Sequence, residues 1–288
     1  MLKLPFKFRD VQEGTVPEGP DFRLAKEVTL DLGGTEINLR LPKHNPKNPG
    51  CNKSIYQEGK CDLYDVRLYQ DYNEIGSWSG AGVLGRSFGF YGPILTGIIA
   101  ELSVGLVIRK RKFTQSSETL FNANIFEREL LDFLALTYSD EKTYYGASNW
   151  HAPCDWKPID KFDKFDIFAI QYDIKRVIGV GNYYTQLAFP IADDCMVIVY
   201  FNYQRFLGGG LEELDRFIDR KPMVDLANNI IDSLQVSFSP QAMKQYKRAK
   251  AENPDAKLSE SMERLKWTTP EDDAKYADYL KNPQNYHF

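Results

Sequence analysis

The chain has 288 residues, of which 43% are hydrophobic and 26% charged, as is usual for a globular protein that buries a sizeable core. Its formal net charge of −4 argues against a general nucleic-acid-binding protein, because such proteins usually carry a basic excess. Aromatic residues make up 14% of the chain, with 17 Tyr, 18 Phe and 4 Trp. Tyr and Trp are favoured in sheets and in interfaces, so the composition fits a β-rich binding protein.

The first ten residues carry several charges and no apolar segment, so they do not resemble a secretory signal. We therefore expect a cytoplasmic protein with reduced thiols rather than a disulfide framework. The four cysteines are Cys51, Cys61, Cys154 and Cys195. Cys51 and Cys61 bracket one loop, and a disulfide between them stays open for an exported protein.

The clearest local pattern in the N-terminal half predicts a β-hairpin over Glu27–Pro42. Apolar and polar residues alternate on both sides of Gly33-Gly34, a pair that supplies the positive φ angles of a tight turn. A similar alternation predicts a strand over Leu63–Tyr72. Ser77–Gly82 is rich in Gly and Ser and is expected to be a turn.

The run from Leu84 to Phe113 contains the longest apolar segment, Phe88–Ile108, and ends in the cations Arg109–Lys112. A membrane-spanning helix over 88–108 with a basic flank is one interpretation. Two buried strands joined at Gly92-Pro93 are the other. The run contains four glycines, a proline and Glu101, and a glutamate inside a membrane is costly, so we favour the two strands. The cations are then expected to mark a solvated strand end.

A helix is predicted to begin at Asn124, because apolar residues recur on one face as far as Leu134. Residues 139–164 are expected to form a long connection that contains an aromatic cluster. Three strands follow at 165–174, 183–191 and 195–206, and the short spacing between them favours an antiparallel meander.

Gly208–Gly210 precedes two predicted helices, and Thr268 or Thr269 is a good start for a further one. The predicted class is α+β, with antiparallel sheets, helices packed on one side and a helical C-terminal extension. We expect an α+β domain over residues 1–239, for which two lobes at 23–138 and 139–239 remain an open division. Residues 240–288 are expected to be a charged helical tail.

No motif in the sequence indicates a catalytic, cofactor or metal site, so none is expected. His151 and Cys154 are the only close pair of histidine and cysteine, whereas a structural zinc site needs about four such ligands. A hydrolase with Cys154 as nucleophile and His151 as base is the enzymatic alternative.

The C-terminal half combines apolar strands ending in CMVIVYFNYQRF with a helix ending in NNIIDSLQVSF. This order resembles the α+β fold shared by the PsbP and Mog1 proteins, and the hairpin that closes in LRLP is similar to an entry strand of such a domain. Several bacterial immunity proteins, which neutralise toxins delivered by type VI secretion, are similar in overall organisation. The resemblance implies a bacterial protein that binds another protein and has no active site.

The aromatic connection supplies the residues that we expect to contact a partner, because Tyr and Trp dominate interface hot spots. They are Tyr144, Tyr145, Trp150 and Trp156. Burial in the core is the alternative for these four side chains. The sequence thus predicts a cytoplasmic, non-enzymatic immunity factor that occludes a toxin, with neither nucleic acid nor a membrane among its partners.

Overall fold

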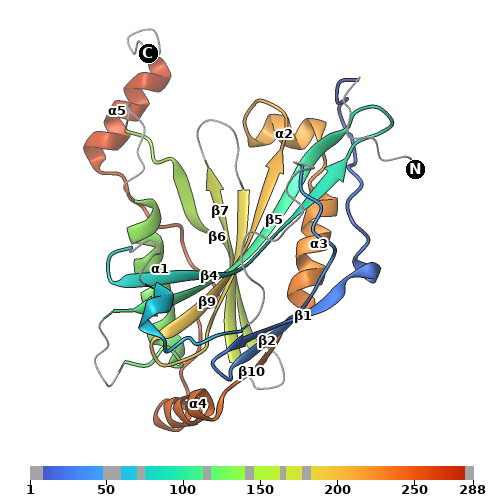
Figure 1. The fold of residues 1–288 in the computed structure, drawn as a ribbon. Helices are drawn as coiled ribbons and strands as arrows, with labels where there is room; N and C mark the ends of the chain where they lie inside the picture. The colour runs from blue at the N-terminus through green and yellow to red at the C-terminus, as the bar shows by residue number, and fades with distance from the viewer. Residues whose placement is uncertain are drawn as a thin grey trace.

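The structure is a computed structural model that describes residues 9–47, 60–69, 75–112, 118–139, 146–162, 167–176 and 183–282. These residues form a six-stranded sheet, a four-stranded sheet and five α-helices (Figure 1). In spatial order the large sheet contains β4 (Trp78–Tyr91), β5 (Ile98–Arg111), β9 (Cys195–Arg205), β8 (Tyr183–Pro190), β7 (Ile167–Arg176) and β6 (Trp150–Phe162). Every neighbouring pair in it is antiparallel.

The small sheet lies over one face of the large one. Its spatial order is β10 (Gln235–Ser237), β2 (Glu36–Leu41), β1 (Lys26–Leu32) and β3 (Lys60–Cys61), and only the short pairing of β1 with β3 is parallel. Two 3-10 helices flank it, η1 (Phe22–Leu24) and η2 (Val66–Tyr69). The α-helices are α1 (Ala123–Tyr138), α2 (Leu211–Phe217), α3 (Lys221–Asp232), α4 (Pro240–Glu252) and α5 (Pro270–Lys281).

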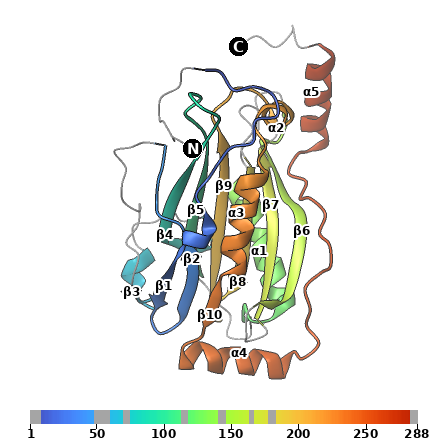
Figure 2. The same ribbon diagram turned by 90° about the vertical axis from the view of Figure 1, so that its right-hand side faces the viewer.

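The large sheet buries apolar side chains on both of its faces. Along β9, Val197 and Val199 contact the core shared with the small sheet and α3, whereas Met196 and Ile198 contact the core beneath α1. Figure 2 shows α3 in front of the large sheet and α1 behind it. The predicted α+β class with antiparallel sheets is confirmed, and its helices are divided between the two faces of the large sheet.

The central run forms two paired strands, as predicted. β4 and β5 are antiparallel along their length, with Phe88 opposite Leu102. No helix among the described residues is long and apolar enough to cross a membrane. Strands from both of the lobes considered above meet in this sheet, because β5 hydrogen-bonds directly to β9.

Of the cations after the central run, Lys112 is exposed, but the expectation of a solvated strand end is wrong for Arg109 and Arg111. The Arg111 side chain is only 3% exposed, and its guanidinium lies 3.6 Å from the Glu129 carboxylate of α1. The guanidinium of Arg109 lies 5.1 Å from the centre of the Phe133 ring. Alternation along β5 turns both arginines toward α1, where their long side chains take part in packing.

Three local predictions are corrected. Residues 62–69 form turns and η2 instead of a strand, because the carboxylates of Asp62 and Asp65 accept hydrogen bonds from nearby backbone N–H groups (Tyr64 and Arg67). Ser77–Gly82 belongs mostly to β4, whose Trp78 is fully buried. The expected connection at 139–164 contains β6, and register shifts along that strand interrupt the alternation that identifies strands in a sequence.

The hairpin, the helix after the central run and the meander match the predictions. Gly33 and Gly34 have φ angles of 71° and 90° between β1 and β2. The cap of α1 is Asn122 rather than Asn124, since the Asn122 side chain accepts the hydrogen bond from the Asn124 N–H. Cys61 is a free thiol whose pKa burial raises to about 11, and Cys51 lies outside the described residues.

The C-terminal fifth of the chain packs against the rest of the protein. The Arg248 guanidinium of α4 lies 2.6 Å from the Asp193 carboxylate in the β8–β9 turn. Residues 253–269 then run along β6 toward α5 (Figure 2). Leu258 is buried in the core beneath α1, and the Leu265 N–H donates to the Ala152 carbonyl oxygen of β6 over 3.1 Å.

Candidate functional site

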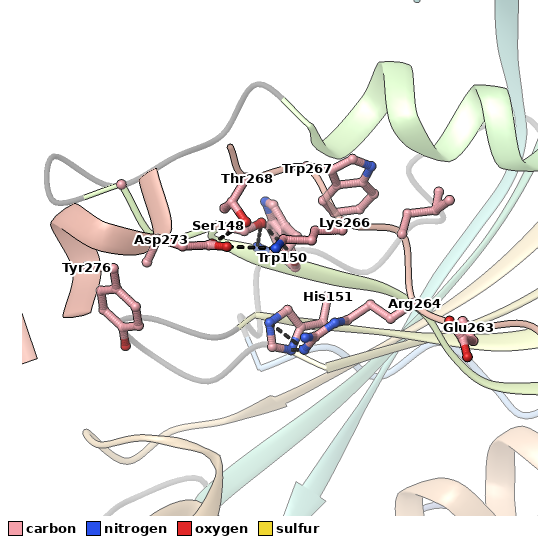
Figure 3. A pocket seen from close by; sticks show the side chains of 13 residues that line it. Ser148, Trp150, His151, Glu263, Arg264, Lys266, Trp267, Thr268, Asp273 and Tyr276 are labelled. Carbon is pink, nitrogen blue, oxygen red and sulfur yellow. Dashed lines mark hydrogen bonds and ion pairs between the residues drawn. The ribbon is translucent and has the colours of Figure 1, made fainter. Parts of the chain in front are cut away.

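A groove of about 550 Å³ lies between the beginning of β6 and the C-terminal segment that leads into α5 (Figure 3). One wall comes from residues 146–151 and the other from residues 263–276. The side chains that give it its chemical character are Trp150, His151, Arg264, Lys266, Trp267 and Tyr276. The groove therefore joins parts of the chain that are more than a hundred residues apart in sequence.

Contacts around the first turn of α5 fix the second wall. The Lys266 ammonium lies 2.7 Å from the Asp273 carboxylate, which also accepts a hydrogen bond from Thr268 over 2.7 Å. Thr269 and Asp272 form a capping box in which each side chain binds the backbone N–H of the other residue. These contacts satisfy donors at the helix end and hold the residues that face the groove.

The loop before β6 comes close to the start of α5. Gly146 has a φ angle of 87°, and a Cβ atom built on it would lie 2.6 Å from the backbone oxygen of Asp272. Only glycine fits a position that combines this backbone conformation with such a close neighbour. The local sequence thus allows the two walls to meet at one end of the groove.

The predicted contact residues have different environments. Trp150 is only 8% exposed and packs against Tyr138 and Tyr184, with ring centres 5.5 and 5.7 Å apart. Trp156 is half-buried, and its indole N–H donates to the Ser259 carbonyl oxygen over 3.0 Å. Tyr144 and Tyr145 lie outside the described residues. Of the two tryptophans that were predicted to contact a partner, Trp150 lines the groove and Trp156 does not.

His151 and Arg264 meet across the groove. The Nη1 atom of Arg264 lies 2.7 Å from Nδ1 and 2.8 Å from Nε2 of the imidazole (Figure 3). Burial lowers the pKa of His151, and the positive charges of Arg264 and Lys175 lower it further. The imidazole is therefore neutral near pH 7, and one guanidinium nitrogen lies close to both of its ring nitrogens.

His151 and Cys154 are not arranged as a base and a nucleophile. The Cys154 thiol donates to the backbone oxygen of His151 over 3.5 Å, while the imidazole of His151 contacts Arg264. Burial raises the pKa of the Cys154 thiol, whereas an activated nucleophile has a lowered one. These contacts do not favour the hydrolase alternative.

A buried polar cluster lies beside the groove on β7, β8 and β9. Asp173 is 7% exposed and accepts hydrogen bonds from the hydroxyls of Tyr183 and Thr185, the second over 2.8 Å. Burial raises the pKa of Asp173 to about 6, an effect that the two hydrogen bonds oppose and that nearby Asp155 strengthens. The Lys175 ammonium lies 2.5 Å from the Asp155 carboxylate. The Tyr203 hydroxyl of β9 donates to the Thr185 hydroxyl over 3.2 Å, so the cluster links three strands of the large sheet.

Sequence reasoning missed the residues of the second wall. Arg264, Lys266, Trp267 and Tyr276 belong to a tail whose composition is charged and weakly apolar, and no short motif links them to Trp150. The aromatic residues Trp267 and Tyr276 in that polar tail were the one available signal. Among the described residues, no group of three or more His, Cys, Asp or Glu side chains is arranged to hold a metal ion.

A scan against protein-family models finds no family that matches this chain. A search of curated proteins finds no similar sequence.

Proposed function

We propose that this protein acts by binding another protein and that the groove between β6 and α5 forms part of its contact surface. The observation that carries the proposal is the meeting of Trp150 with Trp267 and Tyr276 in one hollow. Its volume is about 550 Å³, within the range of roughly 300–1,000 Å³ that is usual for small-molecule pockets. Tyr, Trp and Arg are the residues that most often dominate binding energy at protein interfaces.

The biological form of this proposal is a cytoplasmic bacterial immunity factor that occludes a toxin. Its support is the overall likeness in organisation to immunity proteins, together with an acidic net charge of −4 and the abundance of aromatic residues. Occlusion needs only a complementary surface, so the groove does not have to carry out chemistry. The partner is expected to be encoded beside this protein, as toxins and their immunity proteins commonly are.

The test is co-purification of the tagged full-length protein with the product of the neighbouring gene. Tyr276→Ala is the informative variant because Tyr276 lines the groove. Tyr279→Ala is a matched control on the same helix: its ring stacks on that of Tyr276 with centres 6.2 Å apart, but it does not line the groove.

We expect the wild type and Tyr279→Ala to retain the complex and Tyr276→Ala to weaken it about tenfold or more, as loss of an interface hot spot does. Rescue of cells that express the neighbouring gene should follow the same order. Absence of any complex and of any rescue would remove the proposed function. If the two tyrosine variants bind the partner equally well, the contact surface does not include the groove.

A further inference from the structure

Arg264 carries a positive charge that no described carboxylate neutralises. Among the described residues, the partner of its guanidinium is the neutral imidazole of His151, at 2.7 and 2.8 Å from Nη1. Lys266 differs, because its ammonium is paired with the Asp273 carboxylate over 2.7 Å. Figure 3 shows Glu263 turned away from His151, beyond the backbone of Arg264. Arg264 is therefore the cation in the groove whose charge is available to a ligand.

The guanidinium of Arg264 is held in place, and only one of its nitrogens takes part in the contact with His151. The next residue, Leu265, is fixed by its backbone hydrogen bond to Ala152 on β6, which anchors the chain beside the groove. A guanidinium has five N–H donors in a planar fork, and the contact with His151 uses only Nη1. Such a fork matches the two oxygens of a carboxylate, and a pre-placed fork loses less freedom when it binds.

Two cationic side chains lie near His151: Arg264, and Lys175, which is paired with the Asp155 carboxylate. Arg264 approaches the imidazole from the C-terminal segment, and Lys175 lies opposite His151 on β7. Both positive charges lower the pKa of the imidazole, so they act at the position where a ligand would meet it. Tyr276 supplies aromatic surface in the same hollow, whereas Trp150 lines it but is only 8% exposed. A ligand with a carboxylate next to an aromatic or apolar group would complement both features.

We infer that the partner inserts an acidic side chain into the groove, where its carboxylate binds Arg264 and a neighbouring apolar side chain packs on Tyr276. The inference rests on the proposed function, because it names the part of the partner that the groove takes. Arg264 is the charged receptor, and His151 positions it. The partner segment is an acidic one that also carries an aromatic or large apolar residue.

Phenylacetate and phenylacetamide are a suitable pair of probes, because they share the aromatic ring and differ in charge. Binding to the full-length protein is followed by NMR of labelled histidine, which gives resolvable signals since the chain has 3 His residues. We expect the His151 signal to shift with phenylacetate. The affinity for phenylacetamide should be lower by about tenfold, the usual effect of losing a charge-assisted hydrogen bond.

Arg264→Gln should abolish the preference for phenylacetate, and Arg264→Lys should keep part of it, because lysine retains the charge without the planar fork. Lys221→Gln is the matched control, since it removes an exposed cation of α3 that is 71% exposed and lies outside the groove. Thermal unfolding of each variant shows whether it is folded before its binding is interpreted.

Equal binding of the two probes, absence of binding, or an unchanged preference in Arg264→Gln would each overturn the inference. If the wild-type protein forms no complex with the neighbouring gene product, the proposed function is wrong, whatever the two probes show. If phenylacetate binds through Arg264 while no protein partner is captured, the groove takes a free carboxylate and the inference about an acidic protein segment is wrong. The two failures are therefore separable.

Discussion

Replacement of Asp173 by asparagine tests whether burial of this carboxylate destabilises the fold at neutral pH. Asp173 is 7% exposed, and burial raises its pKa from 3.8 to about 6. The titratable groups around it come from several elements: Asp155 on β6, Lys175 on β7, the Tyr183 hydroxyl on β8, the Tyr203 hydroxyl on β9 and Arg220 before α3. Asparagine keeps the size of the side chain and removes the charge.

The direction in which stability changes with pH follows from proton binding. Between about pH 4 and pH 6 the folded protein holds the proton of Asp173 more tightly than the unfolded chain, so the free energy of unfolding falls as pH rises through this window. A pKa difference of about two units corresponds to about 3 kcal/mol in total, of which about 2 kcal/mol falls between pH 4.5 and 8. The asparagine in Asp173→Asn does not titrate. The free energy of unfolding of this variant, relative to that of wild type, should therefore rise by about 2 kcal/mol between pH 4.5 and 8.

Urea unfolding of wild type and Asp173→Asn at several pH values measures this double difference, in which titrating groups that do not interact with Asp173 cancel. Asp232→Asn, an exposed change at the end of α3, controls for the loss of one carboxylate. A difference between Asp173→Asn and wild type that does not change with pH would refute the argument. It would mean that the hydroxyls of Tyr183 and Thr185 stabilise the carboxylate enough to offset its burial.

Two further predictions concern the walls of the groove, and a third concerns Cys154. Thr269→Ala removes one half of the capping box and should lower the free energy of unfolding by about 1 kcal/mol in urea, whereas Thr269→Ser should have little effect. Gly146→Ala should destabilise the contact of its loop with α5, because the φ angle of Gly146 is 87° and Asp272 is too close for a Cβ atom. Proteolytic cleavage of the segment after residue 253 should then be faster than in wild type, and equal rates would contradict this. Cys154 should react with a thiol reagent at pH 7.5 more slowly than a free cysteine, since burial raises its pKa, and a rate at or above that of free cysteine would show an activated thiol.

The parts of the fold that could be predicted are those in which local periodicity agrees with tertiary burial. The Gly33-Gly34 hairpin and the stripe of α1 bury the faces that their patterns indicate. In the central run, glycines and Glu101 distinguished two strands from one helix. These features depend on neighbours along the chain, which a single sequence contains.

Other elements depend on partners that the sequence does not reveal. β6 was missed because its register shifts near Cys154 and Ile159 break the alternation of a strand. The Leu63–Tyr72 pattern alternates, yet the Asp62 and Asp65 side chains bind the backbone and favour turns. Arg109 and Arg111 were expected in solvent because charge alone suggested it, whereas packing against α1 buries them.

The groove could not be predicted, because one of its walls is the segment that follows the core of the domain. That segment is held by contacts distributed along its length: Leu258 is buried beneath α1, and Ser259 donates to the Glu127 carboxylate through its N–H over 2.8 Å. Further along, Leu265 binds β6 through its backbone. Each contact is modest, and together they place Arg264 against His151. The binding geometry that we propose therefore depends on docking of the C-terminal segment, so changes that weaken its docking should weaken carboxylate binding even where they leave the groove residues intact.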